Sequence, residues 1–290
     1  MELKQKYAEV ERILTDLGTV VVAYSGGVDS TLLLKVAVDT LGAKNVLACL
    51  STGPVEPHSV IERARKTAEQ IGVELQTVES NELDDPAFTT NQADRCFHCK
   101  SHLCQVLLDM AKERGFKHVV FGTNYDDLSD FRPGNRAMDV FGIRSPLAEA
   151  KLTKDDIRQL SRQLGLATAD VPSSPCLASR VNYGLEVTEQ RLQQIDQAED
   201  FLRSLGFVEL RVRHHDTIAR IEVGGSDIEK LSKEPMRSRI VEKLKSLGFK
   251  YVTVDLQGFR SGSLNESLSE EEKAPHHRGG NKPPHRGGGG

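Results

Sequence analysis

The feature that most constrains this chain is a glycine turn that joins an apolar run to a helical pattern. Residues 19–23 are apolar and mostly β-branched, as in a buried strand, and residues 31–41 have helical spacing. The turn between them contains Ser-Gly-Gly-Val-Asp-Ser. Because glycine has no Cβ, backbone N–H groups at Gly26 and Gly27 can point inward, and the helix N-terminus adds partial positive charge. The sequence therefore predicts an anion-binding loop.

Hydroxyl groups at both ends of this loop fit a bound phosphate. Ser25, Ser30 and Thr31 can each donate a hydrogen bond to a phosphate oxygen. The loop contains no lysine, and the pattern G-x-x-x-x-G-K-[ST] does not occur in the chain, which disfavours a Walker-type NTPase. An ordinary glycine turn without a ligand is the alternative. We favour phosphate binding because six specified residues agree in the right context.

Composition limits the protein class. The 290 residues are enough for two domains, and 38% hydrophobic with 28% charged residues is typical of a soluble globular protein. No apolar run reaches the ~18 residues of a membrane span, and residues 1–5 do not resemble a signal peptide, so we expect a cytoplasmic protein. A net charge of −4 argues against a large nucleic-acid surface. Five cysteines in a reducing compartment suggest a metal or redox site.

Strand and helix patterns alternate through the first part of the chain. Further strands are predicted at residues 45–50, 74–78 and 118–122, and helices at 1–17, 59–72 and 94–114. This order predicts an α/β domain over residues 1–180, with a doubly wound parallel sheet whose ligands lie at the carboxyl ends of its strands. Both the glycine loop and Gly122 lie at such ends.

The pattern changes near residue 181. Helices are predicted at residues 187–206 and 235–248, and strands at 207–214, 218–223 and 251–256. We therefore predict a smaller C-terminal α+β domain over residues 181–268, with a role in substrate binding or oligomerisation. The tail, residues 269–290, is acidic and then rich in His, Arg, Gly and Pro, so we expect it to be disordered.

Three cysteines form a candidate metal site. Cys96 and Cys99 are three apart in a helical pattern, so they face the same side, and Cys176 lies in a distant loop. They could simply fill a core. They could hold zinc, with His98, His102 or Cys104 as a further ligand. They could instead hold a 4Fe–4S cluster with one iron open to an external ligand such as hydrosulfide. We favour the cluster.

Charged residues outside the loop give further candidates. Arg211 and Arg213 are two apart on a predicted strand and share a face, which suits phosphate binding; an exposed basic sheet face is the alternative. Asp127 and Arg132 follow the strand that ends near Gly122, where they could hold Mg²⁺ or a substrate carboxylate, or form a solvated loop. Glu199 on the long second-domain helix is a weaker candidate for the same role.

The combination resembles a known family. The loop motif is similar to that of the PP-loop ATP pyrophosphatases, and the whole set is similar to the LarE-type ATP-dependent sulfur transferases within that superfamily. The narrower segments that carry this resemblance are Asp130-Phe131-Arg132-Pro133-Gly134, Cys176 with Ser179-Arg180, Arg211-Val212-Arg213, and the run from Asp255 to Gly262. The likeness extends to about Leu268.

This resemblance implies a specific reaction. Such enzymes have an adenine nucleotide alpha hydrolase-like fold and adenylate pyridinium-3,5-biscarboxylic acid mononucleotide, a nicotinate-derived substrate, releasing pyrophosphate. They convert its carboxylates to thiocarboxylates for the nickel-pincer nucleotide cofactor of lactate racemase. By this resemblance Asp29 helps hold Mg²⁺ with ATP, Arg180 joins Arg211 and Arg213 at the substrate phosphate, and Cys176 is catalytic. Some members sacrifice one cysteine as sulfur donor, whereas this chain matches the three-cysteine, 4Fe–4S form.

Alternatives and partners follow from the same comparison. A tRNA thiolation enzyme of the superfamily or an ammonia-using amidating synthetase would share the loop, and a non-catalytic nucleotide sensor would bind ATP without releasing pyrophosphate. The acidic charge balance disfavours tRNA. We expect sulfide or a sulfur-donor protein as partner, no membrane, and a homo-oligomer.

Overall fold

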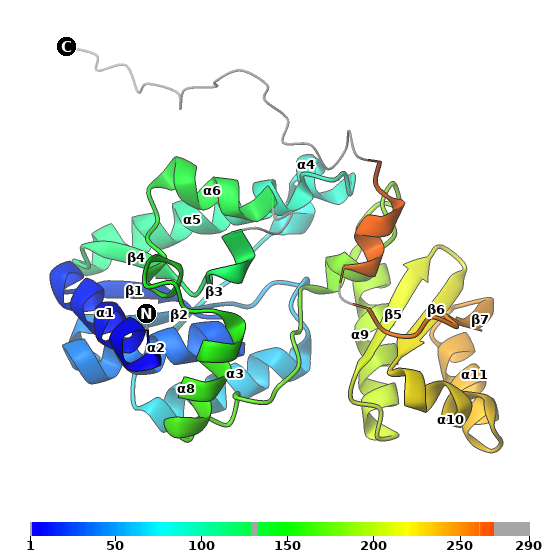
Figure 1. Ribbon diagram of the computed structural model, residues 1–290. Coiled ribbons are helices and arrows are strands. Elements are labelled where there is room, and N and C mark those ends of the chain that lie inside the picture. Colours follow the sequence, from blue (N-terminus) through cyan, green and yellow to red (C-terminus); the bar gives the residue numbers. More distant parts are fainter. Residues whose placement is uncertain (1, 129–132, 261, 270–290) are drawn as a thin grey trace, which may run out of the picture.

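The computed structural model describes residues 2–128, 133–260 and 262–269, which form two units (Figure 1). The first unit is built on a four-stranded parallel sheet in the order β3-β2-β1-β4. Its strands are β1 (Val20–Ala23), β2 (Val46–Ser51), β3 (Glu74–Val78) and β4 (His118–Phe121). The central position of β1 places the glycine loop that follows it in the middle of the carboxyl edge of the sheet.

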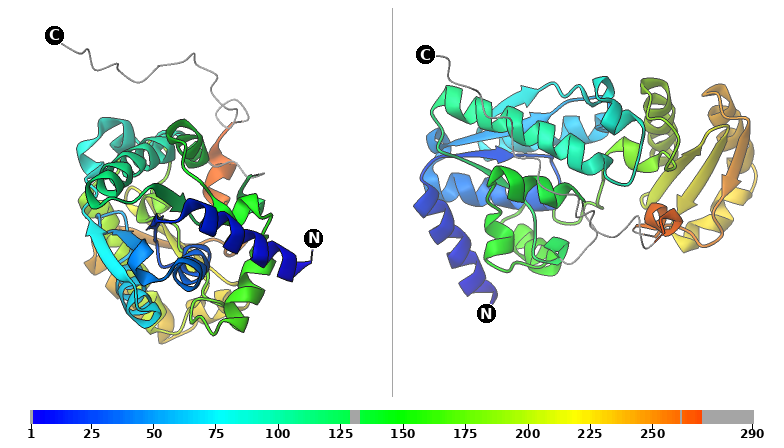
Figure 2. Two further views of the ribbon diagram at one scale, coloured as in Figure 1. Left: turned by 90° about the vertical axis from the view of Figure 1, so that its left-hand side faces the viewer. Right: turned by 90° about the horizontal axis from the view of Figure 1, so that it is seen from above.

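Helices cover both faces of this sheet. Along β1, Val20 and Val22 pack with α1 (Leu3–Leu17), α2 (Val28–Leu41), α3 (His58–Ile71) and α8 (Lys154–Gln163), whereas Val21 packs with α5 (Arg95–Arg114) on the other face. Side chains of a strand alternate between faces, so a strand covered on both sides must be apolar throughout. Helix α6 (Pro133–Phe141) lies beside α5 (Figure 2), and α4 (Pro86–Thr89) and α7 (Pro146–Glu149) are single turns.

The second unit has its own core. Strands β5 (Leu210–His215) and β6 (Ile218–Val223) form an antiparallel hairpin, and β7 (Tyr251–Val254) adds in parallel to β6. Helices α9 (Glu189–Ser204), α10 (Ile228–Ser232) and α11 (Met236–Ser246) complete it (Figure 1). Its apolar cluster includes Leu202, Phe207, Val212 and Leu244, which are separate from the clusters of the parallel sheet.

The 3-10 helix η4 (Leu177–Arg180) lies at the junction of the two units, and η6 (Ser263–Ser267) ends the described chain. The predicted doubly wound parallel sheet with a smaller α+β unit is confirmed. The domain boundary at residues 180 and 181 stays a prediction, and residues 270–290 of the predicted disordered tail lie outside the described residues. In the part of the chain that the structure describes, no helix has the length and apolarity of a membrane span.

Candidate functional site

The glycine loop closes tightly between β1 and α2. Gly26 has φ +68°, a left-handed conformation that favours glycine, and a Cβ added there would lie 2.6 Å from the Cβ of Ala64. The Ser25 N–H donates to Ser30 Oγ at 3.2 Å, and the two serine hydroxyls lie 3.1 Å apart. Gly27 precedes the first residue of α2 as its N-cap. The loop thus bends around a hydroxyl pair at a helix N-terminus, the geometry of an anion site.

A cavity of about 280 Å³ opens over this loop, at the carboxyl ends of β1, β2 and β4. Of the predicted loop residues, Ser25, Gly27, Asp29 and Ser30 line it, and so does Gly122. A Cβ on Gly122 would lie 2.8 Å from the backbone nitrogen of Ser30, so β4 approaches the start of α2 closely. The other lining residues are Ala23, Tyr24, Cys49, Leu50, Ser51, Glu56, Val60, Ile61, Lys100, Leu103, Phe121, Thr123, Asp127 and Asn135.

Two predicted loop residues have a different place. Thr31 is completely buried, and its hydroxyl does not line the cavity. Gly26 packs against Ala64 of α3 and is likewise not part of the lining. Of the three loop hydroxyls, those of Ser25 and Ser30 therefore belong to residues that line the cavity, whereas that of Thr31 does not.

Asp29 is held by two residues that sequence reasoning missed. Its Oδ2 accepts from Lys154 Nζ at 2.5 Å, and its Oδ1 accepts from Asn124 Nδ2 at 3.4 Å. Lys154 is the first residue of α8, whose N-cap Thr153 forms a capping box with Asp156. The pattern Thr-Lys-Asp-Asp is a helix-start signal that could have located α8, although not the pairing of its lysine with a residue 125 positions away.

Asp127 lies beside the same cavity. Its backbone N–H donates to Asn124 Oδ1 at 3.0 Å, and its Oδ2 accepts from the Asn124 N–H at 3.2 Å. Asn135 of α6 donates to the Asp127 carbonyl oxygen at 2.9 Å. These bonds fix Asp127 on the cavity wall, at the edge where Asp29 also lies. Its predicted neighbour Arg132 lies outside the described residues.

The cavity lining also includes Lys100 and Glu56. Lys100 of α5 lies 4.5 Å from the ring centroid of Phe121. Burial, then the nearby Glu82, raises the pKa of Glu56 to about 7 against the opposing charges of Lys100 and Arg180. The wall of this cavity therefore contains a cation and a titratable carboxyl group in addition to the glycine loop.

The three candidate thiols lie next to this wall. Cys96 is exposed, and Cys99 and Cys176 are half-buried against one apolar cluster that includes Val55 and Leu177. Cys99 Sγ lies 3.6 Å from Glu82 Oε1. Burial and then Glu82 raise the pKa of the Cys99 thiol, and a further contribution comes from Cys176.

The thiols influence one another electrostatically. Burial and then Cys96 raise the pKa of the Cys176 thiol to about 11. Among the described residues no three His, Cys, Asp or Glu side chains are arranged to hold a single metal ion. The other two cysteines are elsewhere: Cys104 is completely buried, and Cys49 Sγ contacts Met110 Sδ at 3.4 Å. The structure therefore separates a group of three thiols from two packed ones.

Glu199 and Arg180 form a buried ion pair at the junction. Both side chains are completely buried, with Arg180 Nε donating to Glu199 Oε1 at 3.0 Å. Glu199 also accepts from Arg203 at 2.7 Å and from the Val212 N–H at 3.1 Å. Burial raises the pKa of Glu199, but Arg180 and the other arginines outweigh this and lower it. Both oxygens of Glu199 are thus used within the protein, away from a ligand.

Arg213 and Arg211 have different surroundings. Arg213 donates to both oxygens of Glu222, at 3.1 and 2.9 Å, and to Ser263 Oγ at 2.8 Å. Among the described residues, Arg211 donates hydrogen bonds only to the carbonyl oxygens of Leu210 and Ser173, and its guanidinium lies over the ring of Phe259. Burial, followed by Arg180, lowers the pKa of Arg211 to about 10. Of the three predicted phosphate-binding arginines, Arg211 has the least compensated charge.

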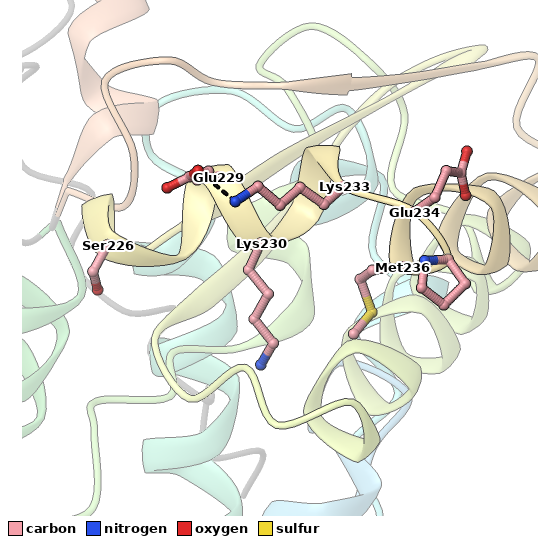
Figure 3. Close-up of a pocket in the computed structure, with 7 residues that line it drawn as sticks. Ser226, Glu229, Lys230, Lys233, Glu234 and Met236 are labelled. Atoms are coloured by element: carbon pink, nitrogen blue, oxygen red, sulfur yellow. Dashed lines mark ion pairs between the residues drawn. The ribbon is translucent and has the colours of Figure 1, made fainter.

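A second hollow lies in the C-terminal unit, between α10 and the start of α11 (Figure 3). Lys233 and Glu229 form an ion pair there at 2.6 Å, and Lys230 and Glu234 add charges of both signs. These charged side chains are long and flexible, and none of the predicted site residues lines this hollow. We place the candidate site in the cavity over the glycine loop.

Comparison with known proteins gives full-length and partial relatives. The NAD synthase family matches residues 9–96. The pyridinium-3,5-bisthiocarboxylic acid mononucleotide synthase of Lactiplantibacillus plantarum is 38% identical over 94% of this chain and 98% of its own length. An uncharacterized protein of Synechocystis is 40% identical over 92% of this chain and its entire length. The NH3-dependent NAD+ synthetase of Methanococcoides burtonii is 28% identical over 56% of this chain and 62% of that enzyme.

Proposed function

The chain belongs to the family of pyridinium-3,5-bisthiocarboxylic acid mononucleotide synthases, and from this premise we propose that it converts carboxylates of pyridinium-3,5-biscarboxylic acid mononucleotide to thiocarboxylates. As a member of this family it is an ATP-using enzyme that releases AMP and pyrophosphate. One observation carries the proposal: Lys100 lines the cavity of the phosphate loop, and its neighbour Cys99 belongs to the group of three thiols. Activation and sulfur delivery would then share one wall. The product would serve nickel-pincer nucleotide synthesis.

In the first step the substrate carboxylate attacks the α-phosphorus of ATP. A phosphorus–oxygen bond forms, the bond to the pyrophosphate oxygen breaks, and an acyl-adenylate results. The loop N–H groups with Ser25 and Ser30 stabilise the charge on the leaving pyrophosphate. Asp29 would hold part of the Mg²⁺, which requires Lys154 to leave its present partner and turn to the phosphates. Asp127 lies where it could complete the Mg²⁺ site or orient the carboxylate.

In the second step a sulfur nucleophile attacks the activated acyl carbon, a carbon–sulfur bond forms, and AMP leaves. A buried thiol is a poor nucleophile in this role: with its pKa raised to about 11, Cys176 is protonated at neutral pH. Binding to a metal removes that proton. The reaction therefore needs sulfur that is deprotonated by binding to a metal. Three cysteines in apolar surroundings can provide thiolate ligands for that metal.

We propose that Cys96, Cys99 and Cys176 hold a 4Fe–4S cluster. Each of the three thiolates would bind a different iron of such a cluster, so they need not converge on the single point that one metal ion requires. When bound, the cluster would supply sulfide from the iron that no cysteine binds. The chain's own residues then orient the substrate. Arg211, which forms no ion pair with a carboxylate of the described residues, is the best placed arginine for the substrate's phosphate. Sulfide or a sulfur-donor protein would replenish the sulfur, and we expect a homo-oligomer.

The amidating alternative has partial support. The likeness to the NH3-dependent NAD+ synthetase covers about half of this chain, and such an enzyme would use ammonia against the same acyl-adenylate. It would have no need of the three thiols. A tRNA substrate remains the third alternative.

The test is an anaerobic reaction of the iron-reconstituted full chain with MgATP and the biscarboxylic mononucleotide, followed by mass spectrometry. Sulfide is supplied in one arm, ammonia in a second, and tRNA replaces the mononucleotide in a third. We expect oxygen-to-sulfur exchange in the first arm only, with pyrophosphate released in step, and loss of exchange in Cys176→Ala. Asp29→Ala should stop pyrophosphate release. Amide formation, tRNA thiolation or unchanged exchange in the cysteine variant would refute the proposal.

A further inference from the structure

We propose that Asn91 is a positioning residue that holds the segment following Cys176 against the first turn of α5, so that Cys176 meets Cys96 and Cys99. This inference rests on the proposed function, because it concerns how the three thiols are brought together. Asn91 lies in the loop between α4 and α5, is completely buried, and has φ +57°. Asparagine is one of the few residues that tolerate this left-handed conformation.

The side-chain amide of Asn91 reaches across to the junction between the two units. Its Nδ2 donates to the carbonyl oxygens of Asn182 and Leu185, each at 2.8 Å, and lies 3.4 Å from that of Val181. Carbonyl oxygens accept only, so the nitrogen of the amide must face this segment. No hydroxyl or apolar side chain of similar size supplies two donors in that direction.

The other end of the amide binds the cysteine-bearing helix. Asn91 Oδ1 accepts a hydrogen bond from Arg95 Nη1, and Arg95 is the buried first residue of α5, next to Cys96. The Arg95 guanidinium also lies 4.9 Å from the ring centroid of Tyr183, in the same junction segment. One amide therefore joins the backbone after Cys176 to the residue before Cys96.

Backbone bonds form a frame around this bridge. The Val187 N–H donates to the Thr89 carbonyl at 2.8 Å, and the Leu177 N–H, directly after Cys176, donates to Val55 O at 2.6 Å. The Leu177 bond holds the segment at its beginning, the Val187 bond holds it at its end, and Asn91 holds residues 182–185 between them. Removing the amide should loosen this middle part, leaving the phosphate loop unchanged because it lies on other elements.

The test compares Asn91→Gly with Lys151→Gly in the full chain. Glycine accepts the backbone of both positions, since Lys151 has φ +58° and is exposed, so only the first variant loses a buried amide. Metal-free, reduced protein is treated with dibromobimane, which links neighbouring thiols, and peptide mass spectrometry identifies the links. We expect the rate of linking Cys176 to Cys96 or Cys99 to fall at least fivefold in Asn91→Gly and to stay at the wild-type rate in the control.

The dissociation constant for ATP, measured by calorimetry, should change less than twofold in both variants. A general loss of structure would weaken ATP binding by more than this. A wild-type linking rate in Asn91→Gly, or no such link in the wild type, would overturn the inference. Should Asn91→Gly fail to fold, Asn91→Asp keeps the volume and the acceptor for Arg95 but loses both donors, and the same slowing is expected. Because linking needs neither substrate nor sulfur transfer, its outcome is independent of whether the proposed reaction occurs.

Discussion

Gly26 offers the most direct test of the loop geometry. A Cβ added at this position would lie 2.6 Å from Ala64 Cβ, 3.1 Å from its Cα and 3.4 Å from its backbone nitrogen. Ala64 is completely buried in α3, so neither a rotamer change nor a flexible side chain can relieve the contact. The backbone at Gly26 is also left-handed, which an alanine adopts only with strain. Gly26→Ala therefore adds two separate costs.

The size of the effect follows from these two costs. Left-handed backbone in a residue with a Cβ costs roughly 1–2 kcal/mol. Inserting a methyl group into a packed contact costs roughly 1–3 kcal/mol. Together they lower the free energy of unfolding of the parallel-sheet unit by about 2–5 kcal/mol. For a domain of this size that corresponds to a decrease in melting temperature on the order of 10 °C.

Urea denaturation of Gly26→Ala, Ala64→Gly and the double variant separates the two costs. Ala64→Gly removes the opposing methyl group and costs about 1 kcal/mol by itself in a helix. In the double variant the 2.6 Å contact between the two methyl groups is removed, whereas the 3.1 Å approach to the Cα of residue 64 and the backbone strain remain. The stability of the double variant should therefore exceed the additive value by about 1–3 kcal/mol. The control is Gly27→Ala, whose φ is −80° and whose nearest atom is Ser25 Oγ at 3.5 Å. We expect the control to cost less than about 1 kcal/mol. An additive cycle, or a Gly26→Ala protein as stable as the control, would show that the side chain of Ala64 does not restrict position 26.

Three further predictions concern charged groups of the site. Lys154→Met should raise the KM for ATP by about 10-fold or more in pyrophosphate-release assays, as expected for a lost charged hydrogen bond. The free energy of unfolding should change by less than about 1 kcal/mol, because the ion pair of Lys154 with Asp29 is partly exposed. An unchanged KM would show that the lysine never reaches the phosphates. Burial raises the pKa of Glu56 to about 7, so its contribution to stability is present below its ordinary value near 4.5 and is lost as pH rises through 7. Between pH 5 and pH 8, the free energy of unfolding of the wild type, measured by urea denaturation, should fall by roughly 1–3 kcal/mol more than that of Glu56→Gln. The same pH dependence of stability in both proteins would contradict this. Glu199→Ala leaves Arg180 buried without its partner and should cost about 3–5 kcal/mol by chemical denaturation, whereas a small loss would mean that water reaches the guanidinium.

Much of the fold could be predicted because the parallel sheet is buried on both faces. Residues 20–22 are all valine and all completely buried, so the sequence pattern of a central strand is continuous and unambiguous. The glycine loop is similarly clear, because Gly26 has to be left-handed and close to α3. Helix α8 was missed, although Thr153 and Asp156 form a capping box at its start.

The arrangement of the charged residues was harder to predict. Spacing along a strand indicates that Arg211 and Arg213 share a face, but it cannot indicate which acidic residue of another element each one meets. Arg213 meets Glu222 on the neighbouring strand, whereas Arg211 meets the backbone carbonyl of Ser173 in the segment that joins the two units. Glu199 was predicted as a weak candidate for a ligand site, and the structure uses both its oxygens to fix Arg180. Such pairings depend on tertiary contacts that leave no periodic signal.

The absence of lysine from the glycine loop has a structural consequence for the whole site. A triphosphate needs more positive charge than backbone N–H groups and one helix N-terminus provide, so cations must come from other elements. Lys154 of α8 is already bound to Asp29 at the loop, and Lys100 of α5 lines the same cavity as the loop. Helix α5 is also the helix that carries Cys96 and Cys99. A nucleotide bound between the loop and Lys100 would therefore draw on the same helix that presents the thiols, which links activation of the carboxylate to the place where sulfur must arrive.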